Sequence, residues 1–305
     1  MNFGKRILLG AYYHATLPRR RAEERFRCAQ GSDPVRILFY HRIADDHPNP
    51  WTMRRRQFTQ QIDWIADRYE VISLAEAQQR IASGTNDRPA VAITFDDGYA
   101  DNVDHALPLL LDKKLPFTYF VTTANVMDQK PFPHDARRGA PLAPNTPADI
   151  QALAESGVEI GAHTRTHADL GRIDLDQLAN EIVGSKTDLE QIIGSPVRYF
   201  AFPFGQHENM TLAGMCVARE AGFAGVCSAY GGYNFPGNNA FHLQRIHADP
   251  EIIRLKNWLS VDQRKLRSTV PFEIREEAHH GGFSTDDNMD AVRRSALPLV
   301  TEGSC

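Results

Sequence analysis

Short apolar runs of β-forming residues alternate with segments of helical apolar spacing along the chain from Val35 onward. This alternation is typical of βα units that build a parallel sheet, and it constrains the fold more than any other feature of the sequence. The expected strands lie at residues 35–40, 91–94, 117–121, 158–161, 199–202, 223–227 and 242–246. A chain of 305 residues can form such a sheet and its covering helices as one domain. We therefore expect an α/β fold.

The two ends of the chain differ from this middle part. Residues 1–34 form a basic arm, since Met1 to Arg27 carry seven basic and two acidic residues, a net charge of +5. The apolar run at residues 7–13 is too short to span a bilayer and lacks a clean small-residue cleavage site. An arm lying on an anionic membrane surface and a solvated arm are equally compatible with this pattern. We expect the catalytic domain at residues 35–266 and a disordered tail at 267–305.

Charge and cysteine content limit the partners and the compartment. The formal net charge of -4, with no Lys/Arg stripe through the middle of the chain, argues against a nucleic-acid partner. The four cysteines, at positions 28, 216, 227 and 305, have no metal-binding or dense disulfide spacing. They favour a reducing compartment slightly, so we expect a cytoplasmic or peripheral membrane location, with export left open.

Two adjacent carboxylates follow one of the expected strands. Residues 90–94 are an apolar β run, so Asp96 and Asp97 fall at its carboxyl end, where α/β folds place their active sites. Two carboxylates are costly to hold together unless a cation compensates them. However, a turn that uses Asp-Gly explains Asp97-Gly98 at least as well when this segment is considered alone.

A pair of histidines follows another expected strand. Residues 158–162 lead into His163 and His167, which lie four positions apart. If their loop winds into a helical turn, both imidazoles fall on one side and can bind one ion. With one aspartate they form a two-nitrogen, one-carboxylate set that leaves positions open for water and substrate, as catalytic metal sites do.

These segments resemble a known family. Residues 94–99 (TFDDGY) and 163–167 (HTRTH) are similar to the first two motifs of the polysaccharide deacetylases, the NodB-homology group of carbohydrate esterases. Residues 200–205 (FAFPFG) follow in the order of the third motif. The resemblance covers roughly residues 35–259. It implies a single distorted (β/α) barrel of the NodB-homology type with about seven strands.

The resemblance also implies a reaction. Relatives remove N-acetyl groups from N-acetylhexosamine units of a polysaccharide or lipid-linked glycan and release acetate. By this likeness, Asp97, His163 and His167 hold a divalent metal, with zinc as the first expectation and cobalt, manganese or nickel as alternatives. Asp96 is then the general base toward a metal-bound water that attacks the amide.

Further roles follow from the third motif. The backbone N–H of Phe204 is expected to stabilise the oxyanion together with the metal, and Tyr99 and Pro203 are expected on the substrate side. Many relatives place an arginine before the aromatic or proline position to orient the base, but that position is Ala201 here. Arg245, at a later strand end, is the better candidate to hold Asp96, although an ordinary core-edge ion pair would explain it too.

The general acid has two candidates. The commonest pattern places it in a Leu-x-His near the end of the domain, where the nearest match is the segment ending in His247. A subgroup that acts on exported poly-N-acetylglucosamine carries it in a Tyr-His pair on the first strand, as in Tyr40-His41. We prefer His41, with His247 as the alternative.

Two loops could form part of the substrate site, and two other functions are compatible with the sequence. The proline-rich stretch at 125–145 suggests a substrate-side flap, and the aromatic, glycine-rich stretch at 230–235 suggests part of a glycan groove, although loop packing would explain either. A small-molecule amidohydrolase of the same fold is an alternative function. An inert glycan-binding module is another, but Asp96, Asp97 and both histidines are all present, which argues against it.

Overall fold

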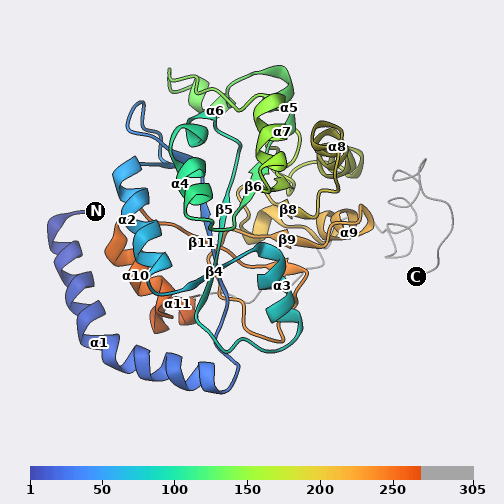
Figure 1. Ribbon diagram of the computed structural model, residues 1–305. Helices are drawn as coiled ribbons and strands as arrows, with labels where there is room; N and C mark the ends of the chain where they lie inside the picture. The colour runs from blue at the N-terminus through green and yellow to red at the C-terminus, as the bar shows by residue number, and fades with distance from the viewer. Residues whose placement is uncertain (269–305) are drawn as a thin grey trace.

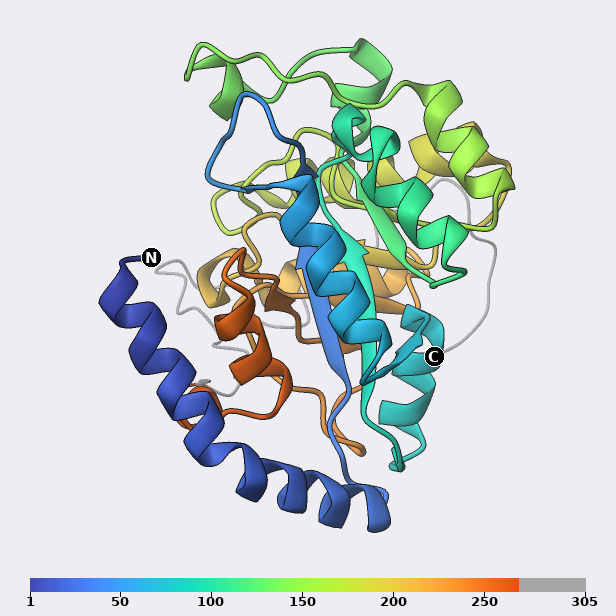
Figure 2. The same ribbon diagram turned by 60° about the vertical axis from the view of Figure 1, so that its left-hand side comes forward.

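A computed structural model describes residues 1–268 of the chain. The described part is a curved parallel sheet surrounded by helices, with a long N-terminal helix along one side (Figures 1 and 2). Most of the tail that the sequence predicts to be disordered, residues 267–305, lies outside the described residues.

The main sheet has nine strands, and every pair in it is parallel. Their order is β10-β9-β8-β7-β6-β5-β1-β11, and β4 pairs with β5 beside this path. The strands are β1 (Arg36–Tyr40), β4 (Glu70–Ile72), β5 (Ala90–Phe95), β6 (Thr118–Val121), β7 (Glu159–Ala162), β8 (Tyr199–Ala201), β9 (Gly225–Cys227), β10 (His242–Leu243) and β11 (Ile246–His247).

The two ends of this sheet are joined by one short segment. β10 pairs with β9, whereas β11 pairs with β1 at the opposite end of the order. Only Gln244 and Arg245 separate β10 from β11. The sheet therefore curls into the distorted barrel that the sequence predicts, and the single strand expected at 242–246 is divided between its two edges.

All seven expected strands are present, and β4 is the one strand of this sheet that the sequence analysis missed. β4 has three residues and begins with a glutamate, so it shows no apolar run to distinguish it from a loop. A separate two-stranded sheet is formed by β2 (Arg42–Ile43) and β3 (Thr52–Met53), which pair in parallel. It anchors the loop between them at the carboxyl end of β1.

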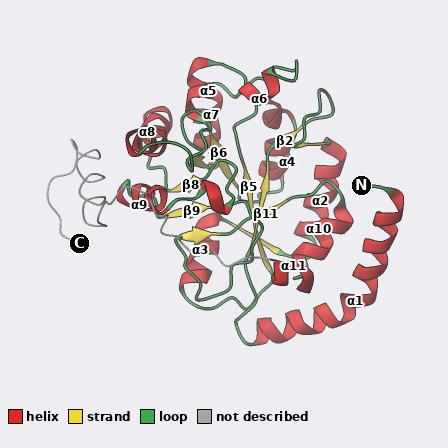
Figure 3. Ribbon diagram, turned by 180° about the vertical axis from the view of Figure 1, so that it is seen from behind, coloured by secondary structure: helices red, strands yellow, loops and turns green. Residues whose placement is uncertain are grey.

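Helices lie outside the strands (Figures 1 and 3). They are α1 (Phe3–Ala29), α2 (Arg55–Ala66), α3 (Leu74–Ala82), α4 (Ala106–Asp112), α5 (Thr123–Asp128), α6 (Pro133–Ala136), α7 (Pro147–Glu155), α8 (Leu175–Ile193), α9 (Leu212–Glu220), α10 (Ile252–Leu259) and α11 (Gln263–Ser268), with 3-10 turns at Ala100–Asp104 and His207–Asn209. α8 begins at Asp174, whose carboxylate accepts from the Gln177 N–H, and ends at Gly194 with φ 66°.

The core has an outer and an inner part. Helices bury apolar stripes against the sheet, as α2 does with Phe58, Ile62 and Ile65, all fully buried. Burial of each such side chain contributes about 1.5–3 kcal/mol. Inside the barrel, Phe120 lies so close to Gly161 that a Cβ there would come within 2.4 Å of its ring. Position 161 therefore requires glycine for packing rather than for backbone conformation.

The N-terminal arm is a helix of 27 residues with Pro18 inside it. Arg20 is buried and donates to the Asn257 carbonyl and side-chain oxygens, both at 3.0 Å. The Tyr12 hydroxyl donates to Asp262 at 3.1 Å. These contacts dock α1 on α10 and the segment after it (Figure 2). Among the described residues, none of the helices is both long enough and apolar enough to cross a bilayer.

Candidate active site

The residues of the three sequence motifs meet at the carboxyl end of the sheet. Asp96 and Asp97 follow β5, and His163 follows β7, with β6 between these strands. Four non-glycine residues here adopt left-handed backbone conformations: Asp97 (φ 77°), Thr164 (64°), His167 (59°) and Phe204 (61°). Such conformations cost on the order of 1–3 kcal/mol each and concentrate at functional sites.

Asp97, His163 and His167 bring one ligand atom each into a single cluster. The Nε2 atoms of His163 and His167 lie 3.4 and 3.3 Å from the Asp97 Oδ1 atom. All three ligand atoms lie within 4.8 Å of one another. Within the described residues, this Oδ1 atom is buried and has no hydrogen-bond partner. A cation would satisfy that oxygen, so the donor set fits a divalent metal.

The neighbouring backbone fixes the orientation of His163. Its Nδ1 lies 2.7 Å from the Ala201 carbonyl oxygen. Because a carbonyl only accepts, Nδ1 must carry the proton, and the Nε2 lone pair is left facing Asp97. Ala201 occupies the position where many relatives carry the base-orienting arginine. In this chain the residue contributes its backbone carbonyl to the histidine and has no side chain that could reach Asp96.

Helix α8 holds the loop that carries both histidines. Glu181 accepts from the backbone N–H groups of Arg165 and Thr166, each at 2.9 Å, and from the Thr166 hydroxyl at 2.7 Å. The guanidinium of Arg165 binds Asp188 with two hydrogen bonds of 2.8 and 2.7 Å. A Cβ at Gly184 would lie 2.6 Å from Nε of Arg165, so this glycine gives the arginine room to cross α8.

Arg245 binds both carboxylate oxygens of Asp96. Its Nη1 and Nη2 atoms lie 2.6 and 2.8 Å from Oδ1 and Oδ2, and both side chains are buried. Burial alone would raise the pKa of Asp96, but the charge and hydrogen bonds of Arg245 together with the charges of His163 and His41 outweigh it, and the pKa is lowered. Asp96 is therefore ionised and held in one orientation, which is what a general base requires.

Hydrogen bonds and aromatic rings hold the side chain of Arg245 in place. Its Nε donates to the Ser228 carbonyl at 2.9 Å, and Nη1 also donates to the Thr94 hydroxyl at 3.1 Å. The guanidinium lies over the rings of Phe39 and Phe120, at 4.9 and 5.3 Å from their centroids. Because Arg245 lies between β10 and β11, the segment that closes the sheet also supplies the partner of Asp96.

Both candidate acids lie on the opposite side of Asp96 from the histidine pair in the strand order. His41 directly follows β1, and the Tyr40 carbonyl accepts from the Asp96 N–H at 2.9 Å. His247 ends β11, which lies beyond β1. The two imidazole rings are 6.4 Å apart. The structure thus brings both candidates near the site, with His41 one strand from the base and His247 two strands away.

Burial and nearby carboxylates act on both histidines. Burial lowers the pKa of His41, and the carboxylates of Asp97 and Asp96 oppose that effect. Burial lowers the pKa of His247 to about 4, and the carboxylates of Asp249 and Asp96 oppose it there. The position of His41, one strand from Asp96, is therefore what distinguishes it from His247.

A loop between β2 and β3 covers the acid side of the site. It carries Trp51, which is 44% exposed and lies over His41 with ring centroids 4.7 Å apart. Trp51, His247 and Pro250 line a small cavity beside His41. The sequence analysis did not single out Trp51, although a tryptophan just after the first strand end is a signal that could have found it.

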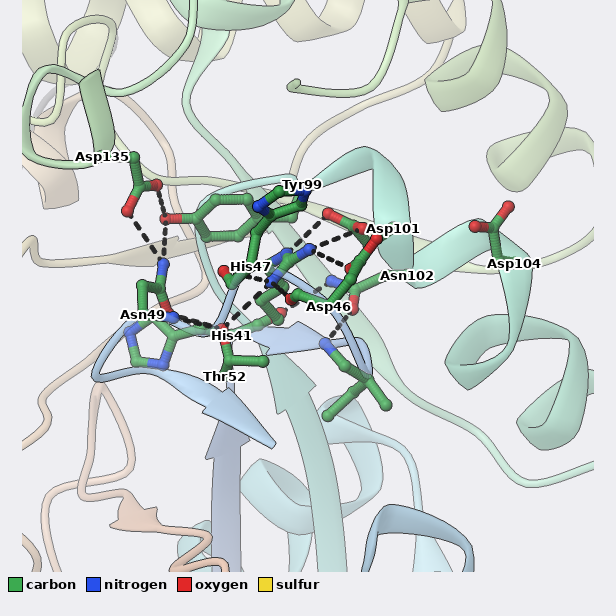
Figure 4. A network of polar contacts seen from close by, with 12 residues as sticks. His41, Asp46, His47, Asn49, Thr52, Tyr99, Asp101, Asn102, Asp104 and Asp135 are labelled. Atoms are coloured by element: carbon green, nitrogen blue, oxygen red, sulfur yellow. Dashed lines mark hydrogen bonds and ion pairs between the residues drawn. The ribbon is translucent and has the colours of Figure 1, made fainter. Parts of the chain in front are cut away.

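Arg42 shapes this loop. Its guanidinium binds Asp101 with two hydrogen bonds of 2.7 and 2.9 Å and donates to the carbonyls of Asp46 and His47 (Figure 4). The Asn102 side chain donates to the His41 carbonyl at 2.7 Å and accepts from the Ile43 N–H at 2.9 Å. The backbone on both sides of Arg42 is therefore fixed, and His41 with it.

Tyr99 connects the same loop to the proline-rich stretch. Its hydroxyl is buried and donates to Asp135 at 2.7 Å (Figure 4). It also lies 3.1 Å from Nε2 of His134. Asn49 also donates to Asp135, at 3.0 Å. The hydroxyl expected on the substrate side is therefore bound within the protein, where it braces the stretch at 125–145.

Phe204 lies at the metal side of the site. Its ring is 52% exposed, and its centroid lies 5.0 Å from that of His167. Within the described residues the Phe204 N–H donates no hydrogen bond, so it is available for an oxyanion. Pro203 before it is buried. A Cβ at Gly205 would come within 2.6 Å of the Ala229 nitrogen, so the turn after Phe204 requires glycine.

One expectation about the groove is wrong. The stretch at 230–235 lies away from the carboxyl end at its centre, because Asn234 pairs with Val35 at the start of β1. Tyr233 is buried and donates to the Trp258 carbonyl at 2.6 Å. Tyr233 and Asn234 therefore pack at the amino end of the barrel, since the chain must return there to begin another parallel strand, whereas Tyr230 stacks on His207 with ring centroids 4.3 Å apart.

Comparisons with known proteins agree with this geometry. Residues 83–226 match the family described as polysaccharide deacetylase. The part of the chain that carries these motifs is similar to the polysaccharide deacetylases. Members of this family are hydrolases that act on N-acetyl amides. The matched residues include Asp96, Asp97 and both histidines of the cluster, but neither candidate acid and not Arg245.

Relatives support the same assignment over a longer part of the chain. The chain is 23% identical over 216 residues to the putative polysaccharide deacetylase YxkH of Bacillus subtilis, which covers 70% of this chain and 71% of that protein. It is 27% identical over 128 residues to a peptidoglycan-N-acetylglucosamine deacetylase of Bacillus cereus, covering 41% of this chain and 39% of that one.

Solved structures show the same fold. IcaB from Ammonifex degensii superposes with a TM-score of 0.61 at 24% identity, over 75% of this chain and 97% of that one. The deacetylase PplD of Streptococcus pyogenes, solved with acetate, gives a TM-score of 0.62 at 21% identity, over 74% and 98% of the two chains. The barrel expected from the motifs is therefore that of the deacetylase structures.

Proposed function

We propose that this polysaccharide deacetylase removes N-acetyl groups from N-acetylhexosamine units of a glycan, with a divalent metal held by Asp97, His163 and His167. The observation that carries the proposal is the cluster itself: two imidazoles converge on a buried carboxylate oxygen that has no other partner. This donor set can be occupied by zinc, and also by cobalt, manganese or nickel. When bound, the cation supplies Lewis-acid polarisation of the amide carbonyl and favours deprotonation of a water molecule.

Asp96 is the general base in this reaction. It is not part of the ligand cluster, so its oxygens are available to accept a proton from the attacking water. Arg245 holds the carboxylate ionised and fixes the direction of its lone pairs through the two hydrogen bonds. As the water oxygen bonds to the acetyl carbon, the carbonyl oxygen becomes negative and the Phe204 N–H donates to it.

His41 is the general acid. The carbon–nitrogen bond breaks only if the departing nitrogen gains a proton, so the acid must lie on the leaving-group side. Within the described residues, the buried Nδ1 of His41 has no hydrogen-bond partner. Asn102 fixes the backbone of His41, and Trp51 packs on its ring. Acetate and a free amine are the products.

Two exposed aromatic rings support a sugar substrate. Trp51 lies beside the acid, and Phe204 lies beside the metal cluster. Aromatic faces of this kind suit the apolar faces of sugar rings, and both rings are about half exposed to solvent. This exposure favours a polymeric glycan over a small-molecule amidohydrolase substrate.

Acetate release tests the proposal. Protein reconstituted with zinc is incubated with N-acetylglucosamine oligomers, and acetate is measured for the wild type and for the Asp96→Asn and His163→Ala variants. We expect acetate from the wild type and a loss of about two to four orders of magnitude in both variants. Equal release by all three proteins would contradict the proposal. Release from N-acetylglucosamine monomer but not from oligomers would assign a small-molecule substrate instead.

A further inference from the structure

The outer face of α1 is apolar where a helix on a protein surface is usually polar. The exposed residues Phe3, Ile7, Ala11, Ala15, Pro18, Ala22 and Phe26 recur at intervals of three or four, so they form a stripe on one side of the helix, where Arg21 and Arg25 interleave with them in the second half. Phe3 and Phe26 are 79% and 68% exposed, Ile7 is 56% exposed, and Leu8 beside the stripe is 75% exposed. Large apolar side chains gathered in this way indicate a binding surface.

The inner face of the same helix carries apolar and polar side chains together. Tyr13 is buried, and Leu9 and Leu17 are half-buried. Arg20 and Tyr12 use their polar groups to bind Asn257 and Asp262, as described above. Phe3, Ile7 and Leu8 are thus exposed in addition to the apolar residues that dock the helix, which is costly in water and points to a partner that covers them.

The charges beside the stripe are all positive. Lys5, Arg6, Arg19, Arg21 and Arg25 are exposed. Both carboxylates of the helix are half-buried: Glu23 binds the exposed Arg19 at 2.8 Å, and Glu24 faces the buried Arg36 at 3.6 Å. An apolar stripe with flanking cations is complementary to a bilayer with anionic headgroups.

We propose that α1 binds the surface of an anionic membrane, with Phe3, Ile7 and Leu8 inserted among the lipids. A second copy of the chain is the less suitable occupant, because its α1 would add five exposed cations and no exposed carboxylate to the contact. A bilayer provides both an apolar layer and a plane of negative charge. The helix lies on the membrane rather than crossing it.

The docked helix is connected to the catalytic side of the molecule. Arg6 lies 3.4 Å from Glu251, and the N-terminal amine lies 4.0 Å from the same carboxylate. Glu251 begins the segment that leads into α10, shortly after His247. The first turns of α1 are therefore the part of this helix that contacts the segment between β11 and α10.

Vesicle co-flotation of the full chain tests this proposal and needs no enzymatic activity. Vesicles of phosphatidylcholine alone are compared with vesicles that contain one quarter phosphatidylglycerol. We expect the partition coefficient on anionic vesicles to exceed that on neutral ones by roughly tenfold or more, and to fall at high salt. The Phe3→Ser/Ile7→Ser/Leu8→Ser variant should lose roughly tenfold or more of that binding.

A matched control separates this face from general exposed apolar surface. Leu111 and Leu212 are 37% and 39% exposed on α4 and α9. The Leu111→Ser/Leu212→Ser variant should bind anionic vesicles like the wild type. Circular dichroism of each variant checks that α1 stays folded, since its inward contacts are untouched.

Three results would overturn the proposal. The first is no enrichment on anionic over neutral vesicles. The second is undiminished binding by the folded triple variant. The third is a wild-type dimer in solution, absent for the triple variant, together with no vesicle binding, which would assign the face to a second copy.

Discussion

Arg245 binds both carboxylate oxygens of Asp96 across the segment that closes the sheet, at 2.6 and 2.8 Å. This pair is fully buried and relies on residues 149 positions apart in the sequence. It explains how Asp96, next to the proposed metal ligand Asp97, can stay ionised without itself joining the cluster. It also makes the base dependent on the barrel being closed.

Substitution of Arg245 should therefore change the pH dependence of activity. Without the paired hydrogen bonds of the guanidinium, burial is opposed less strongly, and the pKa of Asp96 rises. Asp96 must be ionised to act as base. As the pH falls, the variant should therefore lose activity at a higher pH than the wild type does, while activity well above the pKa is retained. We expect Arg245→Lys to lower kcat by about tenfold to a hundredfold and to shift the acidic limb of the kcat profile upward.

Arg245→Met serves as the second variant. It leaves a buried charge unpaired, which should destabilise the fold by about 3–5 kcal/mol as well as lower kcat. Thermal unfolding separates the two effects, because Arg245→Lys should lose less stability than Arg245→Met. An Arg245→Lys enzyme with an unchanged pH profile would show that Arg245 does not control the base.

Removal of the acid should not affect the metal. His41→Ala is expected to lower kcat by roughly a hundredfold to ten-thousandfold, while the metal content measured by atomic absorption stays at the wild-type level. His247→Ala should have a smaller effect on kcat, because His247 lies two strands from Asp96. The reverse order of the two variants would move the role of acid to His247.

Glu181 should control metal affinity from outside the ligand cluster. It accepts three hydrogen bonds from the loop that carries His163 and His167. Glu181→Ala should weaken zinc binding by about tenfold to a hundredfold in a competition titration with a chelator. Asp176→Asn, an exposed acidic position on the same helix, is the control and should leave the affinity unchanged. Equal affinities for all three proteins would show that the loop holds its shape without α8.

Trp51 should contribute to substrate binding more than to chemistry. We expect Trp51→Ala to raise KM for N-acetylglucosamine oligomers by roughly tenfold, the order of one lost stacking contact, with a smaller change in kcat. Trp51→Phe keeps an aromatic face and should recover most of the affinity. If the two variants have the same KM, the ring does not stack on the sugar.

Cys227 should be inert in the folded protein. It is buried inside the barrel, and burial raises the pKa of its thiol to about 12. The thiolate is the reactive form, so alkylation at pH 8 should label Cys227 only after unfolding. Peptide mass spectrometry reports the site directly, and rapid labelling of Cys227 in the native state would contradict the burial.

The sequence predicts the strands and the core of the site well because both have local signals. Each expected strand is an apolar run between turns, and Asp97, His163 and His167 stand in recognisable motifs at strand ends. The pairing of Arg245 with Asp96 was only one of two readings, because sequence alone does not show that residues 242–247 return to the far edge of the sheet.

The features that the sequence analysis missed depend on tertiary contacts. Glu181 lies on an ordinary amphipathic helix, and nothing in its neighbours shows that it faces a loop fifteen or sixteen residues earlier. Trp51 gains its place from Arg42, which folds the loop back over His41. Tyr233 and Asn234 were predicted to line a glycan groove, but they pack at the amino end of the barrel. Aromatic and polar residues in a loop can fill that end as readily as they line a groove.

The Asp96→Asn variant tests the central claim most directly when metal content and acetate release are measured on the same zinc-reconstituted sample. We predict wild-type zinc content for Asp96→Asn and an acetate release lower by roughly two to four orders of magnitude, because the base is lost and the ligand cluster is intact. Undiminished acetate release by this variant at full zinc content would contradict the account.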